Sequence, residues 1–565
     1  MDATVKDTSG RPFQEHPFPS RRGIAEILSR FEQLDSPWTS HRQIAGQLHV
    51  PCSTLYHWID RHQAVMGGTS WPPNAAHFFE SPDGVDFLHR LLTAAHLVFV
   101  QANDCGIRNL GYFLELSGLD EFIAPSYGAQ RAVAEEMESL LIRFGQEEHQ
   151  RLAASMPPRE ITLCEDETFH PQICLVAIEP VSDFLLLEQY QSQRDAATWD
   201  RCLDERLAGL PVTVVQVTSD QSKALIAHTE SHLGAHHSPD LFHIQQDTVR
   251  ATSAALAGQT RAARREREPC QQKTADLRAN YHACREQCPH DPLVETLRQQ
   301  VQQAEAEEAA AAERAAVCQA RQERAKAARQ GLGRDYHPVD LATGRPLTAD
   351  DVQTRLAGHF DALEQIAAEA ALSPSAGQQL AKARRGLDAM LATLVFFWTM
   401  IDVHLEAWRL DTPLREWMRQ QLIPGYYLCR AAEKANTAQE RQRLGALAEE
   451  VLARARSPDG PWGDLSDPVR ADLERKAQQG ADFFQRSSSC VEGRNGQLSL
   501  KHHALHELTS RKLRALTVLH NYLVRREDGS TAAERFYGTA SRELFPWLCD
   551  HLSLPARPRA QRRAA

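Results

Sequence analysis

The chain has 565 residues, of which 42% are hydrophobic, and a formal net charge of −11. A chain of this length has room for several domains with buried cores, so neither metals nor disulfides are needed for folding, and 12 scattered cysteines without a CxxC pair favour a reduced, cytoplasmic setting over secretion. The negative charge argues mildly against a protein whose whole surface binds nucleic acid, but it leaves room for local basic stripes, such as residues 486–535 and the tail after His551.

The N-terminal region contains a candidate DNA-binding unit. Residues 1–20 are polar, carry several prolines and have no apolar signal core, so we expect them to be disordered and expect no export. Over residues 21–66, two short amphipathic helices surround a break at Val50-Pro51, and Thr39 or Ser40 can cap the first of them. This spacing predicts a helix-turn-helix.

In such a unit, the side chains expected to face the major groove or the phosphates are Arg42, Ser53, Thr54, Tyr56 and His57. The local charge is balanced, and any two amphipathic helices joined by a turn share this pattern. Simple helix packing therefore stays the alternative to DNA binding.

Residues 67–158 are predicted to form a helical linker domain. The stretch Ile107–Leu114 either opens a second DNA-contacting module or packs between the N-terminal arm and the rest of the protein, and the second role is the commoner one. Met156-Pro157-Pro158 ends the helical pattern and marks a domain boundary.

Residues 159–246 contain short apolar runs that predict β-strands. A helical pattern over residues 195–207 and another short one near residue 222 interrupt them. The predicted order is β-β-β-α-β-α-β, which gives an α+β or mixed fold. The runs are 161–169, 173–178, 184–187, 212–217 and 241–244.

Two of these strands carry acidic residues at informative positions. Side-chain alternation puts Asp166 on the opposite face of the first strand from Glu165 and Glu167, which share their face with apolar side chains. Asp220 directly follows the fourth strand, which reads as a buried parallel strand, and functional groups gather at the carboxyl ends of such strands. The alternative for Glu165, Asp166 and Glu167 is that they form a charged strand edge. The alternative for Asp220 is that it caps the helix near Ser222.

From residue 247 the composition changes to strong helix formers. Residues 247–334 are rich in Ala, Arg, Gln and Glu with a break at Cys288–Pro292, which predicts two helices of about 40 residues, each about 60 Å long, folded back as an exposed hairpin. Residues 335–480 predict an all-α insertion. Its longest apolar stretch, residues 389–401, is too short to span a bilayer and predicts a buried helix, so no membrane partner is expected.

Residues 481–550 are predicted to close the core, and residues 551–565 form a basic tail. Glu492 follows three serines that can cap its helix, and Arg494 and Asn495 are well placed for phosphate or base contacts. Because the long insertion separates this helix from the strands, spacing does not fix the position of Glu492, and Glu507 and Glu534 remain alternatives for the same role.

The strand order, with Asp166 in the first strand, Asp220 after the fourth and Glu492 on a late helix, resembles the ribonuclease-H-like core of DDE transposases. Asp240-Leu241-Phe242-His243 is similar to an Asp-x-Phe-His sequence of several bacterial transposase families, and it would bring His243 near the site. The alternative is that His243 is a core histidine whose hydrogen bonds are made within the protein. The stretches from Gln485 to Leu498 and from His520 to Phe536 look like the closing block of bacterial insertion-sequence transposases.

The resemblance implies an enzyme in which Asp166, Asp220 and Glu492 bind two Mg²⁺ or Mn²⁺ ions for DNA cleavage and strand transfer. Three clustered carboxylates repel one another, so divalent cations would be needed to keep them ionised. The expected partners are double-stranded DNA at element ends and target, and a second subunit or more, in the cytoplasm at the nucleoid. The alternatives are a transposase-derived DNA-binding regulator without cleavage activity and a scaffold built on the hairpin.

Overall fold

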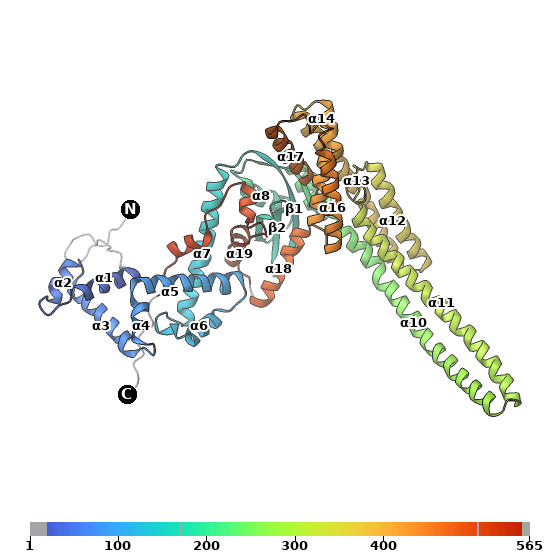
Figure 1. Cartoon of the computed structure of the whole chain (residues 1–565), viewed down its shortest axis with the longest axis horizontal. Helices are drawn as coiled ribbons and strands as arrows, with labels where there is room; N and C mark the ends of the chain where they lie inside the picture. Colours follow the sequence, from blue (N-terminus) through green and yellow to red (C-terminus); the bar gives the residue numbers. More distant parts are fainter. Residues whose placement is uncertain (1–19, 170–171, 506–507, 556–565) are drawn as a thin grey trace.

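The computed structural model describes residues 20–169, 172–505 and 508–555. The protein is a mixed α+β chain, predominantly helical, with one five-stranded sheet near the middle of an elongated molecule (Figure 1). The N-terminal helices form one end, and a long helical hairpin projects from the other. The segment 1–19, predicted to be disordered, and most of the basic tail, residues 556–565, lie outside the described residues.

Three helices fold together at the N-terminus, α1 (Arg21–Leu34), α2 (His41–Gln47) and α3 (Cys52–Gly68). Ser40 begins α2 with a capping box, in which its hydroxyl accepts from the Gln43 backbone N–H and the Gln43 side chain accepts from the Ser40 backbone N–H. The apolar faces of the three helices form a small core of their own, which contains Leu28, Phe31, Ile44, Ala45, Leu55 and Ile59.

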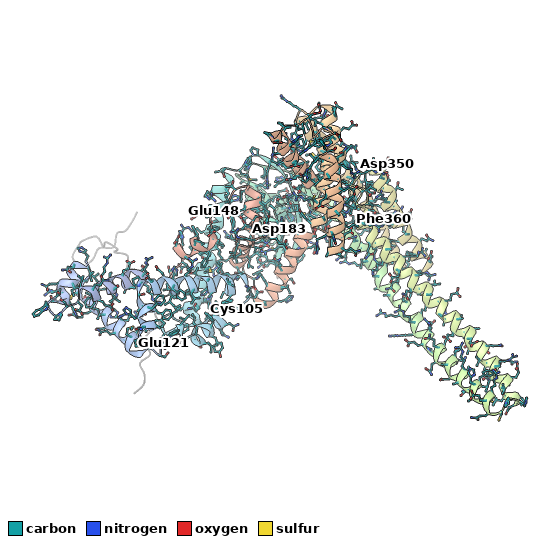
Figure 2. All side chains as sticks on the ribbon, in the orientation of Figure 1. Cys105, Glu121, Glu148, Asp183, Asp350 and Phe360 are labelled. Carbon is teal, nitrogen blue, oxygen red and sulfur yellow. The ribbon has the colours of Figure 1, made fainter. Side chains whose placement is uncertain are left out.

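A second set of helices leads from this unit to the sheet. The set comprises α4 (Pro73–Glu80), α5 (Pro82–Ala95), η1 (His96–Ala102), α6 (Ile107–Leu116), η2 (Leu119–Glu121) and α7 (Tyr127–Ala153). The long helix α7 joins the core around the sheet through buried side chains such as Phe144. Near its end, the buried carboxylate of Glu148 (Figure 2) accepts from Arg151 at 2.7 Å and from the Arg542 backbone N–H at 3.0 Å, which ties α7 to the C-terminal segment.

The sheet contains β1 (Arg159–Phe169), β2 (Ile173–Glu179), β3 (Phe184–Gln191), β4 (Val212–Ser219) and β5 (His236–Pro239). Its strand order is β3-β2-β1-β4-β5. The pairs β1–β2 and β2–β3 are antiparallel, and the pairs β1–β4 and β4–β5 are parallel. Helix α8 (Ala196–Leu207) lies between β3 and β4 in the chain, and α9 (Lys223–Ala227) with η3 (His228–His232) lies between β4 and β5.

The order of elements agrees with the sequence prediction, but the predicted fifth strand is wrong. Leu241–Ile244 forms the first turn of a helix, with Asp240 as its N-cap and with Leu241 and Ile244 buried on one face, three residues apart. The fifth strand is the preceding segment His236–Pro239. Its pairing with the buried strand β4, rather than its own weak strand propensity, determines its conformation.

The hairpin consists of α10 (Leu241–Gln287) and α11 (Pro292–Asp335), which at 1.5 Å per residue are each roughly 65–70 Å long. It therefore starts six residues earlier than predicted. Small and apolar side chains line the seam, where the Thr274 hydroxyl donates to the Ala304 carbonyl at 3.2 Å.

The all-α region packs at the base of the hairpin around buried residues such as Phe360 (Figure 2). Its members are α12 (Ala349–Glu369), α13 (Pro374–Ala407), α14 (Thr412–Trp417), η4 (Met418–Leu422), α15 (Ile423–Glu433), α16 (Ala438–Ala455) and α17 (Asp467–Asp482). Among the described residues, α13 is the one helix long and apolar enough to cross a membrane, and 44% of its most apolar window is buried inside the protein. That burial is compatible with a core helix of a soluble protein.

Helix α13 also packs on β5, the edge strand of the sheet. The ring of His236 stacks on Phe396 with centroids 4.4 Å apart, and Thr393 contacts both His236 at 3.1 Å and Ser238 at 3.1 Å. His236 and Ser238 point to the same side of β5, so α13 covers that face of the strand.

The chain returns to the sheet with α18 (Ser489–Leu505), α19 (Ser510–Tyr522), α20 (Ala532–Tyr537) and α21 (Leu544–His551). These helices share one hydrophobic core with α7 and the strands, through residues such as Val491, Leu516 and Phe536. Figure 1 shows α18 and α19 beside β1 and β2. Two segments of the chain that lie on either side of the hairpin and the all-α region thus build one folding unit.

Candidate functional site

Three carboxylates lie at the carboxyl ends of the parallel strands. In the register of the sheet, Cys164 of β1 pairs with Thr218 of β4, so Asp166 and Asp220 each lie two residues further along at the same level. The last residue of β4, Ser219, pairs with the last residue of β5, so Asp220 and Asp240 are also level with each other. The edge of the sheet where parallel strands end therefore collects Asp166, Asp220 and Asp240.

The two faces of β1 differ as side-chain alternation predicts. Glu165 is fully buried on the opposite face from Asp166, with its Oε1 atom 3.6 Å from Nε2 of His228. Glu167 accepts from Arg194 at 2.8 Å. These two acids have partners of their own, which leaves Asp166 as the acid of this strand that faces the candidate site.

Helix α18 contributes the next members of the site. The Nδ2 atom of Asn495 donates to Oδ2 of Asp166 at 2.9 Å, and Glu492 lies one turn earlier on the same helix. One ligand atom each from Asp166, His243 and Glu492 lie within 4.8 Å of one another. Across residues 20–169, 172–505 and 508–555, this is the one such group of three metal-binding side chains.

The start of α10 contributes His243 and fixes its position. Asp240 is 1% exposed, and its carboxylate accepts from the backbone N–H groups of Phe242 at 2.9 Å and Ser488 at 3.2 Å and from the Ser488 hydroxyl at 2.5 Å. This carboxylate joins the first turn of α10 to the segment that begins α18. It thereby positions His243 relative to Glu492.

Asp220 lies beside this group of three rather than within it. Its Oδ1 atom accepts from the backbone N–H of Ser222 at 2.9 Å, in the turn before α9. The N-cap of α9 is Ser222, so Asp220 does not itself cap this helix, as the alternative from the sequence had it. Its charge still acts on Asp166, as the pKa of that residue indicates.

Burial and like charges perturb the carboxyl groups of the site. Burial raises the pKa of Asp166 to about 7; the charges of Glu492 and Asp220 add to the rise, and His243 opposes it. Burial also raises the pKa of Glu492, with a contribution from Asp240 and an opposing one from His243. Like charges held together at a partly buried edge are stabilised by a bound cation.

The residues present fit a divalent cation. Nε2 of His243 and Oδ1 of Asn495 are both buried and have no hydrogen-bond partner among the described residues. A buried polar atom without a partner is costly and calls for a ligand or an ion nearby. Asp166 and Glu492 supply the carboxylate oxygens that Mg²⁺ and Mn²⁺ prefer, and Asp220 is close enough to act on the same site electrostatically.

Arg494 does not fit the DNA-contacting role that the sequence suggested. Its guanidinium is buried and makes two hydrogen bonds to the buried carboxylate of Glu188, at 2.6 and 2.8 Å, and Thr517 donates to the same carboxylate at 2.6 Å. A buried, bidentate pair of this kind holds α18 and α19 against β3. The buried side chain is therefore not available to a phosphate at the surface, and Arg494 is removed from the predicted DNA-contacting residues. Asn495 contacts Asp166 instead.

The alternatives to Glu492 can be placed in part. Glu534 forms a capping box with Thr531 at the start of α20 and lies 3.7 Å from Arg525, so it has a structural role. Glu507 lies outside the described residues.

On the N-terminal unit, the predicted DNA-contacting side chains share an accessible face. Arg42, Ser53, Tyr56 and His57 are exposed and Thr54 is partly exposed, whereas their neighbours Leu55 and Ile59 are buried. The ring of Tyr56 lies 5.3 Å from that of His41, which links α3 to the start of α2. Within residues 20–169, 172–505 and 508–555, no other part of the protein buries these five side chains.

Helix α6, the possible second DNA-contacting module, also has an exposed face. Leu110 and Leu114 pack inward, while Arg108, Asn109 and Tyr112 are exposed. The packing role is thus present on one side of the helix, and the other side is open.

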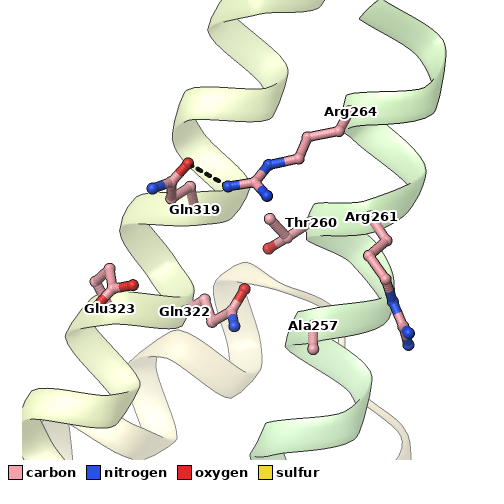
Figure 3. A pocket seen from close by; sticks show the side chains of 7 residues that line it. All are labelled: Ala257, Thr260, Arg261, Arg264, Gln319, Gln322 and Glu323. Atoms are coloured by element: carbon pink, nitrogen blue, oxygen red, sulfur yellow. Dashed lines mark hydrogen bonds between the residues drawn. The ribbon is translucent and has the colours of Figure 1, made fainter.

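A shallow polar pocket lies on the hairpin between α10 and α11 (Figure 3). None of Asp166, His243 and Glu492 lines it. Arg264 of α10 donates across it to Gln319 of α11 at 2.9 Å, and Thr260 lies buried beneath it. The cross-helix hydrogen bond explains the pocket as a part of the hairpin seam.

The sequence prediction did not include Asp240 among the site residues. Two signals could have identified it: it directly follows a parallel strand, as Asp220 does, and it stands three residues before His243. The mistaken fifth strand hid the first signal, because it put Asp240 before the strand instead of after it.

A family of unknown function, DUF6399, matches residues 418–564, about a quarter of the chain. The matched segment runs from η4 through α21 and includes Glu492 and Asn495, whereas Asp166, Asp220 and His243 precede it. No match was found among curated proteins or among solved structures. Over its last quarter the chain is thus similar to a family whose function is unknown.

Proposed function

We propose that the protein is a DDE-type DNA transposase with a ribonuclease-H-like catalytic core, which cleaves DNA at the ends of an element and joins those ends to target DNA. The sheet order β3-β2-β1-β4-β5, with two antiparallel pairs followed by two parallel pairs, is the order typical of that core and supports the proposal. The acids also occur where such enzymes use them, in β1, after β4 and on a helix that follows the sheet.

The observation that carries the proposal is the meeting of Asp166 with residues of α18. The hairpin and the all-α region separate these elements in the chain, yet Asn495 donates to Asp166 at 2.9 Å and Glu492 joins Asp166 and His243 within 4.8 Å. A chain that returns over such a distance to complete a group of acids at a sheet edge is typical of a catalytic site.

In the proposed reaction Asp166, Asp220 and Glu492 bind two divalent ions, Mg²⁺ or Mn²⁺. Bound there, such ions supply activation of the attacking oxygen and stabilisation of the leaving oxygen in an in-line displacement at phosphorus. Asn495 holds the Asp166 carboxylate in one orientation, and Asp240 fixes the start of α18 relative to α10. Water is the attacking group in the first step, and the 3′-hydroxyl that this step exposes attacks target DNA in the second.

The N-terminal unit would bind double-stranded DNA through the exposed face of α2 and α3. Because two element ends are brought together in transposition, we propose that the protein acts as a homodimer or a higher oligomer at the nucleoid. The two ends of the elongated molecule are then free for different tasks, with DNA at one end and the hairpin available to a partner subunit at the other.

The experiment uses supercoiled plasmid that carries the DNA flanking the gene, with Mg²⁺ or Mn²⁺. We expect nicking by the wild type and its loss, by a factor of about a hundred or more, in Asp220→Asn and Glu492→Gln. The matched control is Glu160→Gln, at the opposite end of β1, where the carboxylate pairs with His404 at 2.9 Å. That variant should nick like the wild type.

The same experiment distinguishes the transposase from the alternative function, a DNA-binding regulator. Binding to the plasmid without nicking by the wild type would favour a transposase-derived regulator, whose DNA-binding unit is retained without cleavage. Nicking that survives Glu492→Gln would contradict the assignment of the third carboxylate.

A further inference from the structure

His243 occupies a position that an ordinary surface histidine does not. Its Nε2 atom lies 3.7 Å from Oδ2 of Asp240 and 3.9 Å from Oε1 of Glu492. A ring nitrogen of His243 also lies within 4.8 Å of a carboxylate oxygen of Asp166. The distances to Asp240 and Glu492 both exceed the length of a hydrogen bond. The nitrogen thus faces carboxylates without bonding to any of them.

The Nε2 atom of His243 is buried and lacks a hydrogen-bond partner among the described residues. The side chain as a whole is 34% exposed. Oδ1 of Asn495, whose amide nitrogen donates to Asp166, is likewise buried without a partner among those residues. Two buried polar atoms of one site that are each left unsatisfied call for a further group at that site.

The spacing of the donor atoms fits a metal ion. Around an octahedral ion with ligands at about 2.1 Å, neighbouring ligand atoms are roughly 3.0 Å apart and opposite ones roughly 4.2 Å apart. The 3.9 Å between His243 and Glu492 lies inside this range, and the limit of 4.8 Å for the whole group lies just above it. The donor atoms are therefore close enough together to become ligands of one ion once their side chains adjust.

Asp240 is not available for the same ion. Its two oxygens already accept from Phe242 and Ser488, including a 2.5 Å hydrogen bond from the Ser488 hydroxyl. It acts instead as a positioning residue, because it is the N-cap of the turn that carries His243 and holds the segment before Glu492.

We propose that His243 is a protein ligand, through Nε2, of the metal ion held by Asp166 and Glu492. The inference rests on the proposed function for the presence of that ion and adds to it a nitrogen ligand and a metal preference. An imidazole nitrogen is a softer ligand than a carboxylate oxygen, and it favours first-row transition ions over Mg²⁺. The site therefore prefers Mn²⁺, which also binds carboxylates well.

The first test needs no DNA and no catalysis. Metal-free protein is titrated with Mn²⁺, free Mn²⁺ is followed by its electron paramagnetic resonance signal, and pulsed spectra are recorded on the loaded protein. We expect at least one of the bound Mn²⁺ ions to show hyperfine coupling to a directly bound nitrogen. Because this spectrum is taken on the wild type, it decides the question even if a variant folds poorly.

Two variants test whether the coupled nitrogen belongs to His243. His243→Asn should remove the nitrogen coupling and weaken Mn²⁺ binding by about tenfold to a hundredfold, with a smaller loss for Mg²⁺. The matched control is His404→Asn, whose ring pairs with Glu160 away from the site. This control should keep both the affinity and the coupling.

Failure of the inference and failure of the proposed function have different signatures. Bound Mn²⁺ without nitrogen coupling, together with DNA cleavage, would overturn the role of His243 and leave the function standing. Nitrogen-coupled Mn²⁺ without cleavage would leave the metal site standing and overturn the function. Wild-type protein that binds no Mn²⁺ at millimolar concentration would overturn both.

Discussion

Replacing Asp166 by asparagine should stabilise the metal-free protein. The asparagine keeps an oxygen that can accept from Asn495 and removes a charge that burial, Glu492 and Asp220 all disfavour. Active-site charges of this kind reduce the stability of the fold that carries them. The gain follows from the pKa of Asp166.

The magnitude can be worked from the shift. The pKa of Asp166 rises from the usual 3.8 to about 7. Each unit of difference corresponds to about 1.4 kcal/mol, so the ionised carboxylate costs at most about 4 kcal/mol, and about 2 to 4 kcal/mol after allowance for partial solvent access. Because the folded state holds its proton more tightly than the unfolded state, this cost is absent below pH 3.8, grows as pH rises and is complete above pH 7.

The assay is urea or thermal unfolding in the presence of a chelator at pH 8 and pH 5. At pH 8 the free energy of unfolding of Asp166→Asn should exceed that of the wild type by the amount above, and at pH 5 the gain should fall to about 40% of that amount. The control Glu160→Gln, on the same strand, should show no such pH-dependent gain. Added Mn²⁺ should stabilise the wild type and not the Asp166 variant. An equal gain at both pH values, or none, would refute the argument.

Three further predictions concern other parts of the molecule. Arg494→Met should lower the free energy of unfolding by about 3 to 5 kcal/mol, because it leaves the buried carboxylate of Glu188 unpaired, and the double variant with Glu188→Gln should recover part of that loss in urea unfolding. Arg42→Ala combined with His57→Ala should weaken binding to duplex DNA by about tenfold and reduce its salt dependence in fluorescence anisotropy, whereas unchanged affinity would exclude this face as the DNA contact. Replacing residues 265–318 by a short turn should leave Mn²⁺ binding unchanged, because the outer hairpin is held by its own seam; loss of the metal site would show that the hairpin supports the core.

Much of the core could be predicted because its signals are local. Apolar runs bounded by turn residues predicted β1, β2, β3 and β4, and alternation along β1 separated Asp166 from its acidic neighbours. The fifth strand could not be found in the same way. His236–Pro239 is polar, short and contains a proline, and it is extended because β4 pairs with it and α13 packs against one of its faces.

The late helix shows the limit of sequence reasoning about a site. Charge and sequence position suggested that Arg494 contacts DNA, but its partner Glu188 is distant in the chain, and only folding reveals the pair. Glu492 was one of three possible acids because the insertion makes spacing uninformative. The fold brings Glu492 to Asp166 through contacts of Asp240 and Asn495, which no local pattern encodes.

The most direct measurement of the central claim is strand transfer by a pre-cut element end. A labelled duplex that ends in the 3′-hydroxyl expected after cleavage is incubated with supercoiled target plasmid and Mn²⁺, and joined products are separated on a denaturing gel. We predict joined product with the wild type and with Glu160→Gln, and none with Asp166→Asn, although that variant is folded and binds the duplex. Joining that persists in Asp166→Asn, or wild-type protein that binds the end and never joins it, would contradict the account.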